Sequence, residues 1–250
     1  MNSAARLRIL DRRMKVIVLI PAAGLGTRMA PPRPGKRKTK QFTDLDGTPI
    51  LIHTLRKFAA VAAVAEIYIA LRPEEMPEFR SRLDKETDIM RKHVELVEGG
   101  EHRQKSVGNA LAAILASADD IVLVHDAVRP FVSQETIREV IQAARKYGAA
   151  IAGMPAVDTV KQVERTAQGA LITSTIPRER VVMAQTPQGF HYGILKKAFD
   201  EAAADGFVGT DEASLVERAG GEVAVVMGSP KNIKITTPSD MELAEFFLKK

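Results

Sequence analysis

Hydrophobic residues follow two alternating spacings along the chain. Short, largely apolar runs occur at 16–20, 66–71, 94–97, 121–124 and 222–227. Between them, apolar residues recur at helical spacing over 50–58, 106–115, 133–147, 191–203 and 210–219. Short apolar runs that alternate with helical patterns are typical of a parallel sheet with helices on both faces. We therefore predict an α/β fold with a Rossmann-like, doubly wound, mostly parallel sheet.

This order is interrupted between residues 156 and 177. Two β-type runs, 156–164 and 170–176, are joined by a polar turn at Gln168-Gly169. The pattern predicts a β-hairpin inserted into the α/β order. A two-stranded hairpin is marginally stable alone in water, so it should pack on something else. A partner subunit and a neighbouring part of the same subunit both remain open.

After the hairpin the chain returns to the first pattern and ends in a helix. A short strand is predicted at 232–236, and a capping box of Ser239 and Glu242 should begin the last helix. The chain shows no internal repeat and no low-complexity linker. We predict one domain over 1–250, with 1–14 a flexible extension and 156–177 a β-arm.

Composition narrows the classes of function. The 250 residues are 45% hydrophobic and 27% charged, which are ordinary globular values. The chain has no cysteine, which excludes disulfides and thiol catalysis and is compatible with a reducing cytoplasm, where we expect the protein to act. No apolar run is long enough to span a membrane, so we expect no membrane partner.

The net charge of +5 does not indicate a nucleic-acid partner. Aromatic residues make up only 5% of the chain, and no basic–aromatic pattern suited to base stacking is present. The excess charge is concentrated between Arg33 and Lys40. A small polyanionic ligand is enough to account for this cluster.

The segment 21–28 follows the first predicted strand and resembles a phosphate-binding turn. Gly24 and Gly26 let the backbone approach an anion closely, and Arg28 adds a positive charge. The dinucleotide fingerprint fails because Met29 replaces its third glycine, and no Walker A lysine follows. An ordinary strand–turn–helix junction is the alternative.

The segment 125–130, which directly follows the buried run 121–124, contains two charged residues. Asp126 could accept ribose hydroxyls or lie near a divalent cation, and Arg129 could hold a ligand oxygen. A mutual salt bridge that shapes the turn is the other interpretation. The two interpretations are compatible, and both stay open.

Two further places carry candidate ligand contacts. The turn Gly99–Ser106 has paired glycines that permit close approach to a base or a sugar, although a helix start capped by Glu101 is the simpler alternative. Lys234 is flanked by isoleucines that should point to the opposite face. This lysine therefore faces either a cleft or solvent.

The residue types favour phosphoryl-type chemistry without a covalent intermediate. The five histidines show no metal-ligand spacing, and the chain has no G-x-S-x-G elbow. Glycine-rich turns with several Lys and Arg side chains suit a reaction that depends on positioning and charge neutralisation.

Seven motifs together resemble the 2-C-methyl-D-erythritol 4-phosphate cytidylyltransferase family of the non-mevalonate isoprenoid pathway. They occur in the family's order between about Lys15 and Leu248, at 21–29, 40–42, 124–130, 157–161, 185–188, 210–214 and 232–236. The resemblance implies that CTP and methylerythritol 4-phosphate give CDP-methylerythritol and pyrophosphate. The substrate's own phosphate would attack the α-phosphorus in line, so no enzymic nucleophile is needed.

The resemblance also implies roles for individual residues. The catalytic positions are Arg28 and Lys40 on the triphosphate, and Arg178 and Lys234 on the attacking phosphate. Thr159 and Thr186 match its other contacts. The nucleotide positions are Ala22, Ala23, Gly24, Gly26, Gly100, Glu101 and Ser106, with Asp126 and Arg129 by the ribose.

The family's cofactor and oligomeric state are implied in the same way. Mg²⁺ would be held mainly by the triphosphate of CTP, with no dedicated protein metal site. The 156–177 hairpin resembles the family's dimer arm. A homodimer would then bring Thr159 and Arg178 into the neighbouring subunit's site.

The sequence departs from the family pattern around Lys40. Thr39 precedes it where the family usually has proline, and the segment 31–39 is longer and more basic than typical. The match of Lys40, rather than Lys36 or Lys38, rests on the following Gln41-Phe42. His102 also replaces a common acidic residue.

Three other functions are compatible with parts of this pattern. One is a cytidylyltransferase for another polyol phosphate, such as ribitol 5-phosphate, and another is a sugar-1-phosphate nucleotidylyltransferase. A non-catalytic nucleotide-binding protein belongs to a different class. The presence of all four matched cations, Arg28, Lys40, Arg178 and Lys234, favours an enzyme.

Overall fold

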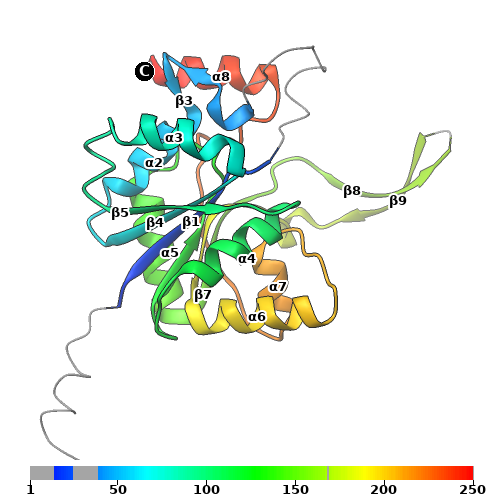
Figure 1. The fold of residues 1–250 in the computed structure, drawn as a ribbon. Helices are drawn as coiled ribbons and strands as arrows, with labels where there is room; N and C mark the ends of the chain where they lie inside the picture. The colour runs from blue at the N-terminus through cyan, green and yellow to red at the C-terminus, as the bar shows by residue number, and fades with distance from the viewer. Residues whose placement is uncertain (1–13, 25–38, 168, 250) are drawn as a thin grey trace, which may run out of the picture.

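The protein is built around one seven-stranded sheet (Figure 1). The computed structural model describes residues 14–24, 39–167 and 169–249. In spatial order the strands are β11 (Ala224–Met227), β7 (Ala149–Pro155), β10 (Val182–His191), β6 (Ile121–Val124), β1 (Val16–Pro21), β4 (Val64–Leu71) and β5 (His93–Glu98). Only β10 runs antiparallel to its neighbours in this sheet. The predicted α/β class with a mostly parallel sheet is confirmed.

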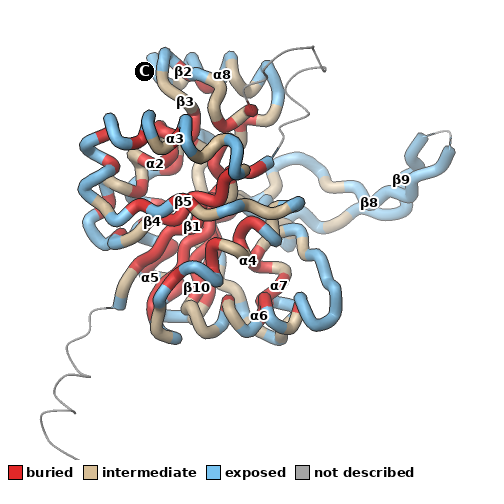
Figure 2. Tube along the Cα trace, viewed as in Figure 1, coloured by how far each residue is buried: buried red, intermediate tan, exposed pale blue. Residues whose placement is uncertain are grey.

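Helices cover both faces of this sheet. One face carries α2 (Ile50–Ala59), α3 (Met76–Leu83) and α5 (Gln134–Tyr147), and the other α4 (Arg103–Ala113), α6 (Tyr192–Ala204) and α7 (Glu212–Arg218). Successive residues of β1 alternate between the two cores. Val18 packs with the first set and Leu19 with the second, and both are fully buried. The central strands are therefore apolar on both sides, and Figure 2 shows that they are buried.

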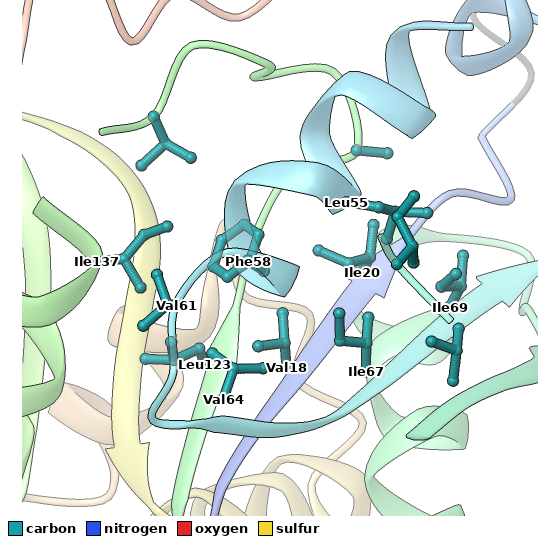
Figure 3. Close-up of a cluster of buried hydrophobic side chains, with 14 of the residues drawn as sticks. Val18, Ile20, Leu55, Phe58, Val61, Val64, Ile67, Ile69, Leu123 and Ile137 are labelled. Carbon is teal, nitrogen blue, oxygen red and sulfur yellow. The ribbon is translucent and has the colours of Figure 1, made fainter. Parts of the chain in front are cut away.

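The core that contains Val18 also contains Phe58, one of the largest fully buried side chains among the described residues. Figure 3 shows Phe58 of α2 among Val18, Ile20 and Leu123 of the sheet. Burying one such side chain stabilises the fold by roughly 1.5–3 kcal/mol. This packing fixes the ends of β1 and β6, from which the candidate ligand loops emerge.

Local capping explains where several helices begin and end. Ser133 accepts a hydrogen bond from the backbone of Thr136 at 3.0 Å, and Gly148 ends α5 with a φ of 87°. Both ends of α5 agree with the prediction. By contrast, α4 begins three residues earlier than predicted, because the side chain of His102 caps it.

Two predictions near the C-terminus are wrong in detail. The last helix, α8 (Pro238–Leu248), is capped by Thr237 and Asp240 rather than by Ser239 and Glu242, and Pro238 suits its first position. Residues 232–236 form no strand. This segment still has an anchored backbone, because the N–H of Ile235 donates to the carbonyl of Val128 at 2.9 Å.

The predicted hairpin is present and projects from the body of the molecule (Figures 1 and 2). It consists of β8 (Val160–Thr166) and β9 (Gly169–Ile176), which pair only with each other. The first strand begins four residues later than predicted, and Gln168 of the predicted turn lies outside the described residues. Leu171 and Ile172 are 64% and 65% exposed, so the arm has apolar surface that this chain does not cover.

The remaining elements are short. They are η1 (Lys40–Phe42), β2 (Asp44–Leu45), β3 (Thr48–Pro49), η2 (Pro73–Glu75) and η3 (Arg178–Arg180). Across the described parts of the chain, no helix has the length and apolar character needed to cross a membrane.

Candidate active site

The predicted ligand loops meet at the carboxyl edge of the sheet. Ala22 follows β1, Gly99 follows β5 and Asp126 follows β6. The N–H of Ala22 donates to Ala70 at 2.8 Å, and that of Gly99 donates to Leu71 at 2.7 Å, so both loops continue the sheet pairing. Open α/β sheets bind ligands at this edge.

The nucleotide-binding positions after β1 and β5 lie against each other. A Cβ on Gly99 would lie 2.3 Å from the Cβ of Ala23, so only glycine allows this contact. The buried hydroxyl of Ser106 accepts a hydrogen bond from the N–H of Gly100 at 3.0 Å. Glu101 is exposed and does not cap the helix, which His102 caps instead.

The structure describes the predicted phosphate loop as far as Gly24. Gly24 has open space at its Cβ position, so nothing in the described chain blocks the loop there. Gly26 and Arg28 lie outside the described residues, as does most of the predicted basic insertion over 31–39.

The segment that carries Lys40 is tied to the same loop. The side chain of Gln41, which is buried, donates to the carbonyl of Ala22 at 2.6 Å. Thr39 is also buried, and its hydroxyl donates to Glu75 at 2.8 Å. Lys40 therefore begins a short helix that is held beside the end of β1.

A carboxylate with three cations lies at the centre of the site. Oδ1 of Asp126 is 3.2 Å from Nε of Arg103, and Oδ2 is 3.2 Å from Nε of Arg129 and 3.0 Å from Nζ of Lys234. Burial opposes ionisation of Asp126, but the three cations outweigh it and hold its pKa well below the usual range. The Asp126–Arg129 salt bridge is thus present, and it lies in the predicted ligand site.

A hydrogen-bonded asparagine places Lys234 in this cluster. Asn232 donates to the carbonyl of Thr186 at 2.8 Å and to Oε1 of Gln185 at 3.1 Å. The backbone carbonyl of Asn232 accepts a hydrogen bond from Nη1 of Arg129 at 2.7 Å. These contacts fix the backbone next to Lys234 although no strand is present.

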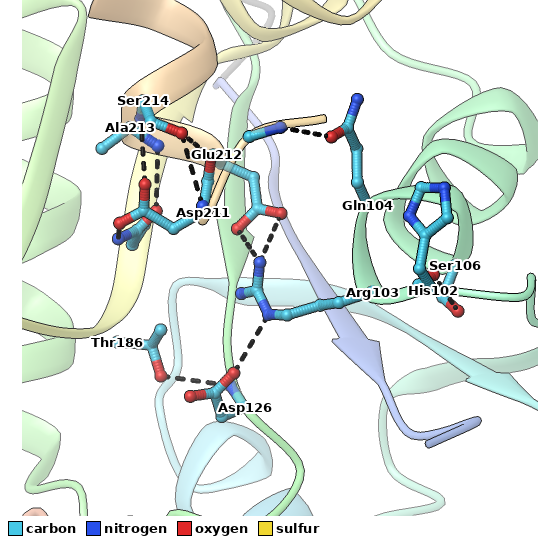
Figure 4. A network of polar contacts seen from close by, with 12 residues as sticks. His102, Arg103, Gln104, Ser106, Asp126, Thr186, Asp211, Glu212, Ala213 and Ser214 are labelled. Atoms are coloured by element: carbon cyan, nitrogen blue, oxygen red, sulfur yellow. Dashed lines mark hydrogen bonds and ion pairs between the residues drawn. The ribbon is translucent and has the colours of Figure 1, made fainter. Parts of the chain in front are cut away.

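Two site residues were missed by the sequence analysis, namely Arg103 and Glu212. Nη1 of Arg103 lies 2.7 and 2.8 Å from the two carboxylate oxygens of Glu212, as Figure 4 shows. Both residues stand inside motifs that the sequence analysis singled out. Nothing in the linear order indicates that they pair, because 109 positions separate them.

The same region joins two other motifs. Gln188 donates to Asp211 at 2.7 Å and accepts from the backbone of Ala213 at 3.1 Å. Asp211 and Ser214 form the capping box of α7, which sets Glu212 at the first helical position. The β10 strand therefore fixes the helix start that carries Glu212.

The hydroxyl of Thr186 lies on the other side of Asp126. It accepts from the backbone N–H of Asp126 at 3.1 Å and lies 3.0 Å from Nδ1 of His125. His125 is fully buried, and this burial lowers its pKa to about 4. The imidazole is therefore neutral near pH 7.

The arm residues stand apart from this cluster. Thr159 is exposed, and Arg178 donates to the carbonyl of Val157 at 2.9 Å. Within the described parts of the chain, neither residue contacts Asp126 or its three cations. One subunit alone therefore does not bring the two arm residues to the site.

The described residues contain no group of three or more His, Cys, Asp or Glu side chains placed to hold a metal ion. Asp126 follows β6 at the same edge of the sheet as the nucleotide loops, and both of its carboxylate oxygens contact cations. Mg²⁺ usually keeps several waters and takes one or two carboxylates besides phosphate oxygens. The donor set therefore fits a metal held mainly by a bound triphosphate.

A cavity of about 500 Å³ lies between α4, α6 and the loop 206–208. Its lining includes Lys105, Phe199 and Phe207. None of the predicted site residues lines it, so it is separate from the cluster around Asp126.

Comparisons with known proteins converge on one family. The family model described as 2-C-methyl-D-erythritol 4-phosphate cytidylyltransferase matches residues 16–250. The protein of that name from Acidobacterium capsulatum is 58% identical over 236 residues, covering 94% of this chain and 98% of the relative. The one from Solibacter usitatus is 52% identical over 238 residues, covering 94% and 96%.

Solved structures show the same likeness. The 2-C-methyl-D-erythritol 4-phosphate cytidylyltransferase of Thermus thermophilus superposes with a TM-score of 0.75 and 35% identity, covering 95% of this chain and all of that one. The 4-diphosphocytidyl-2C-methyl-D-erythritol synthase of Anaerococcus prevotii gives a TM-score of 0.79 and 29% identity, covering 95% and 99%.

Proposed function

The chain belongs to the 2-C-methyl-D-erythritol 4-phosphate cytidylyltransferase family, and we propose that the site at the carboxyl edge of its sheet performs that family's reaction. CTP and methylerythritol 4-phosphate give CDP-methylerythritol and pyrophosphate. The chain is a nucleotidyltransferase, as the family and the relatives' names indicate.

The reaction exchanges one phosphorus–oxygen bond for another. A phosphate oxygen of methylerythritol 4-phosphate attacks the α-phosphorus of CTP, and the bond from that phosphorus to the β-phosphate oxygen breaks. Pyrophosphate leaves in line and keeps the bonding electrons. Such a transfer needs two anions brought together and their charge neutralised, with no covalent enzyme intermediate.

The observation that best supports this function is the convergence of Arg129 and Lys234 on Asp126. We infer that both cations lie where a second anion approaches a nucleotide bound after β1 and β5. In our proposal Lys234 binds the attacking phosphate, Asp126 and Arg129 lie by the ribose, and Thr186 contacts the substrate phosphate. The loop positions Ala22, Ala23, Gly24, Gly100, Glu101 and Ser106 surround the cytidine.

The triphosphate side of the site rests on the family resemblance. Arg28 and Lys40 would neutralise the triphosphate, and the turn containing Gly26 would lie against it. The hydrogen bond from Gln41 to Ala22 supports the place of Lys40, because it holds the start of η1 beside the β1 loop.

We propose Mg²⁺ as the divalent metal that this family typically uses. When bound, it neutralises charge on the triphosphate and the leaving pyrophosphate. Asp126 is the residue of this chain that we expect nearest to it. The protein's own contribution is to hold the nucleotide and the attacking phosphate in line.

The arm supports a homodimer with shared sites. Leu171 and Ile172 expose apolar surface on the arm, and Val182 and Met183 do so at its base. Apolar surface of this kind is typical of an interaction site. We propose one domain over 1–250, including an extension over 1–14, whose 156–177 arm carries Thr159 and the adjoining Arg178 to a partner's site. A cytoplasmic location stays a prediction.

The activity is tested by pyrophosphate release from CTP with Mg²⁺. We expect release only when methylerythritol 4-phosphate is added. Equal or faster turnover with ribitol 5-phosphate would overturn the substrate assignment. Binding of CTP without turnover on any polyol phosphate would favour a non-catalytic nucleotide-binding protein.

A further inference from the structure

The three cations around Asp126 are held in different ways. Nη1 of Arg103 faces both oxygens of Glu212, whose side chain is 1% exposed (Figure 4). Lys234 reaches Asp126 with a flexible side chain that is 37% exposed. Arg103 is thus anchored on its far side by a second carboxylate, whereas Lys234 is the most accessible of the three.

The cations also use different oxygens of Asp126. Arg103 contacts Oδ1, whereas Arg129 and Lys234 share Oδ2. An anion that draws Lys234 away therefore leaves the Arg103 contact intact. The carboxylate of Asp126 is 9% exposed, so water cannot replace a lost cation fully.

Charge balance assigns a role to this arrangement. Two carboxylates, Asp126 and Glu212, face three cations, so one positive charge is in excess. Removing one partner of a buried pair is costly because it leaves an uncompensated charge. With Arg103 in place, the release of Lys234 toward a substrate phosphate leaves Asp126 with two of these three cations, whereas without Arg103 it leaves Arg129 alone.

We infer that Arg103, anchored by Glu212, is the permanent counter-ion of Asp126 and thereby leaves Lys234 available to bind the substrate phosphate. Arg103 is a positioning residue in this scheme, because it acts through Asp126 and Lys234. The inference rests on the proposed function, since it concerns how the same site binds its anionic substrate.

A simpler role is possible for the pair, namely a tie between α4 and α7. Both helices pack in the second core, so the Arg103–Glu212 contact would then add stability only. The two roles differ in what a paired substitution restores. Removing both charges leaves neither Arg103 nor Glu212 as an unpaired buried charge between α4 and α7, so stability returns. It does not return a counter-ion to Asp126.

The test compares Arg103→Gln with the double variant Arg103→Gln/Glu212→Gln, by thermal unfolding and by pyrophosphate release at saturating CTP. Wild-type turnover establishes the proposed function separately. We expect Arg103→Gln to lower the melting temperature and to raise KM for methylerythritol 4-phosphate about tenfold or more. The double variant should recover most of the melting temperature but keep the raised KM.

Two further variants guard against a folding defect. Arg103→Lys keeps the charge but cannot contact both carboxylates as a guanidinium does, so its KM should lie between wild type and Arg103→Gln. Glu212→Gln keeps the Arg103–Asp126 contact but weakens the anchor of Arg103, so its KM should rise, though less than that of Arg103→Gln.

The control is an ion pair outside the cluster around Asp126. Nη2 of Arg56 lies 2.6 Å from Oε2 of Glu86. Arg56→Gln should change the melting temperature without changing KM. A wild-type KM in any folded variant that lacks the Arg103 charge would overturn the inference and leave the pair as a structural tie.

Discussion

The hydroxyl oxygen of Thr186 lies 3.0 Å from Nδ1 of His125 and 3.1 Å from the backbone nitrogen of Asp126. The direction of these hydrogen bonds follows from the far side of the imidazole. Nε2 of His125 is 3.1 Å from the carbonyl oxygen of Arg129, which can only accept. Nε2 therefore carries the proton of the neutral ring, Nδ1 accepts, and the Thr186 hydroxyl donates.

The first prediction concerns this hydroxyl. Thr186→Val keeps the shape of the side chain but leaves Nδ1 of His125 and the N–H of Asp126 without their partner. We expect it to lower the free energy of unfolding by about 1–3 kcal/mol, measured by urea denaturation. Thr186→Ser keeps the hydroxyl and should lose clearly less. Equal losses in the two variants would contradict the prediction, because the methyl group would then contribute as much as the hydroxyl.

The second prediction concerns pH. Burial lowers the pKa of His125 to about 4, so the unfolded chain binds the extra proton more readily than the folded protein does. The stability associated with the neutral ring is complete above about pH 6.5 and is lost as pH falls toward about 4, by up to about 3 kcal/mol.

This pH dependence can be isolated by substitution. His125→Asn removes the titrating group, so the free energy of unfolding should fall less between pH 7 and pH 5 than in wild type. His93→Asn, at an exposed position, should keep the wild-type slope. An unchanged slope in His125→Asn would contradict the prediction.

The third prediction separates binding from turnover at Lys234. Because Lys234 is proposed to bind the attacking phosphate, Lys234→Ala should raise KM for methylerythritol 4-phosphate and lower kcat by roughly a hundredfold or more. The affinity for CTP, measured by calorimetry, should change little. Lys231→Ala, an exposed lysine of the same segment, is the matched control. Loss of CTP binding alone would mean that Lys234 serves the nucleotide.

The fourth prediction tests the shared site by mixing two inactive variants. Arg178→Ala lacks the arm residue, and Lys234→Ala lacks the body residue. In a mixed dimer, one site combines the intact arm of the second chain with the intact body of the first. Random exchange should then restore about a quarter of wild-type sites.

The mixing experiment has a clear negative outcome. If Arg178 serves the site of its own chain, no mixed dimer holds a complete site and activity stays at the level of the separate variants. A protein that remains monomeric and fully active on dilution would contradict the dimer arm in the same way.

Much of the fold could be predicted because it depends on local patterns. The run 121–124 and the helix between Ser133 and Gly148 were correct, since apolar spacing and caps act within a few residues. The strands β7 and β10 were missed. Their alanines, glycines and glutamines give a weak β signal, and β10 is ordered by pairing with β6 and β7.

The segment around Lys234 shows both outcomes. Its alternating pattern correctly separated the lysine from its flanking isoleucines, and Ile235 is fully buried. The predicted strand is absent because the backbone pairs elsewhere: the carbonyl of Asn232 accepts from the side chain of Arg129, and the N–H of Ile235 donates to the carbonyl of Val128. Residues can thus alternate between buried and exposed side chains without backbone hydrogen bonds to a neighbouring strand.

The sequence by itself determined the class of fold, the family and the cations available to an anionic substrate, because these depend on residue type, spacing and motif order. Only the tertiary structure decided which charges meet. Arg103 and Glu212 lie 109 positions apart, yet they pair because α4 and α7 pack on the same face of the sheet. The strength of an ion pair depends on distance and burial, which the linear order does not contain.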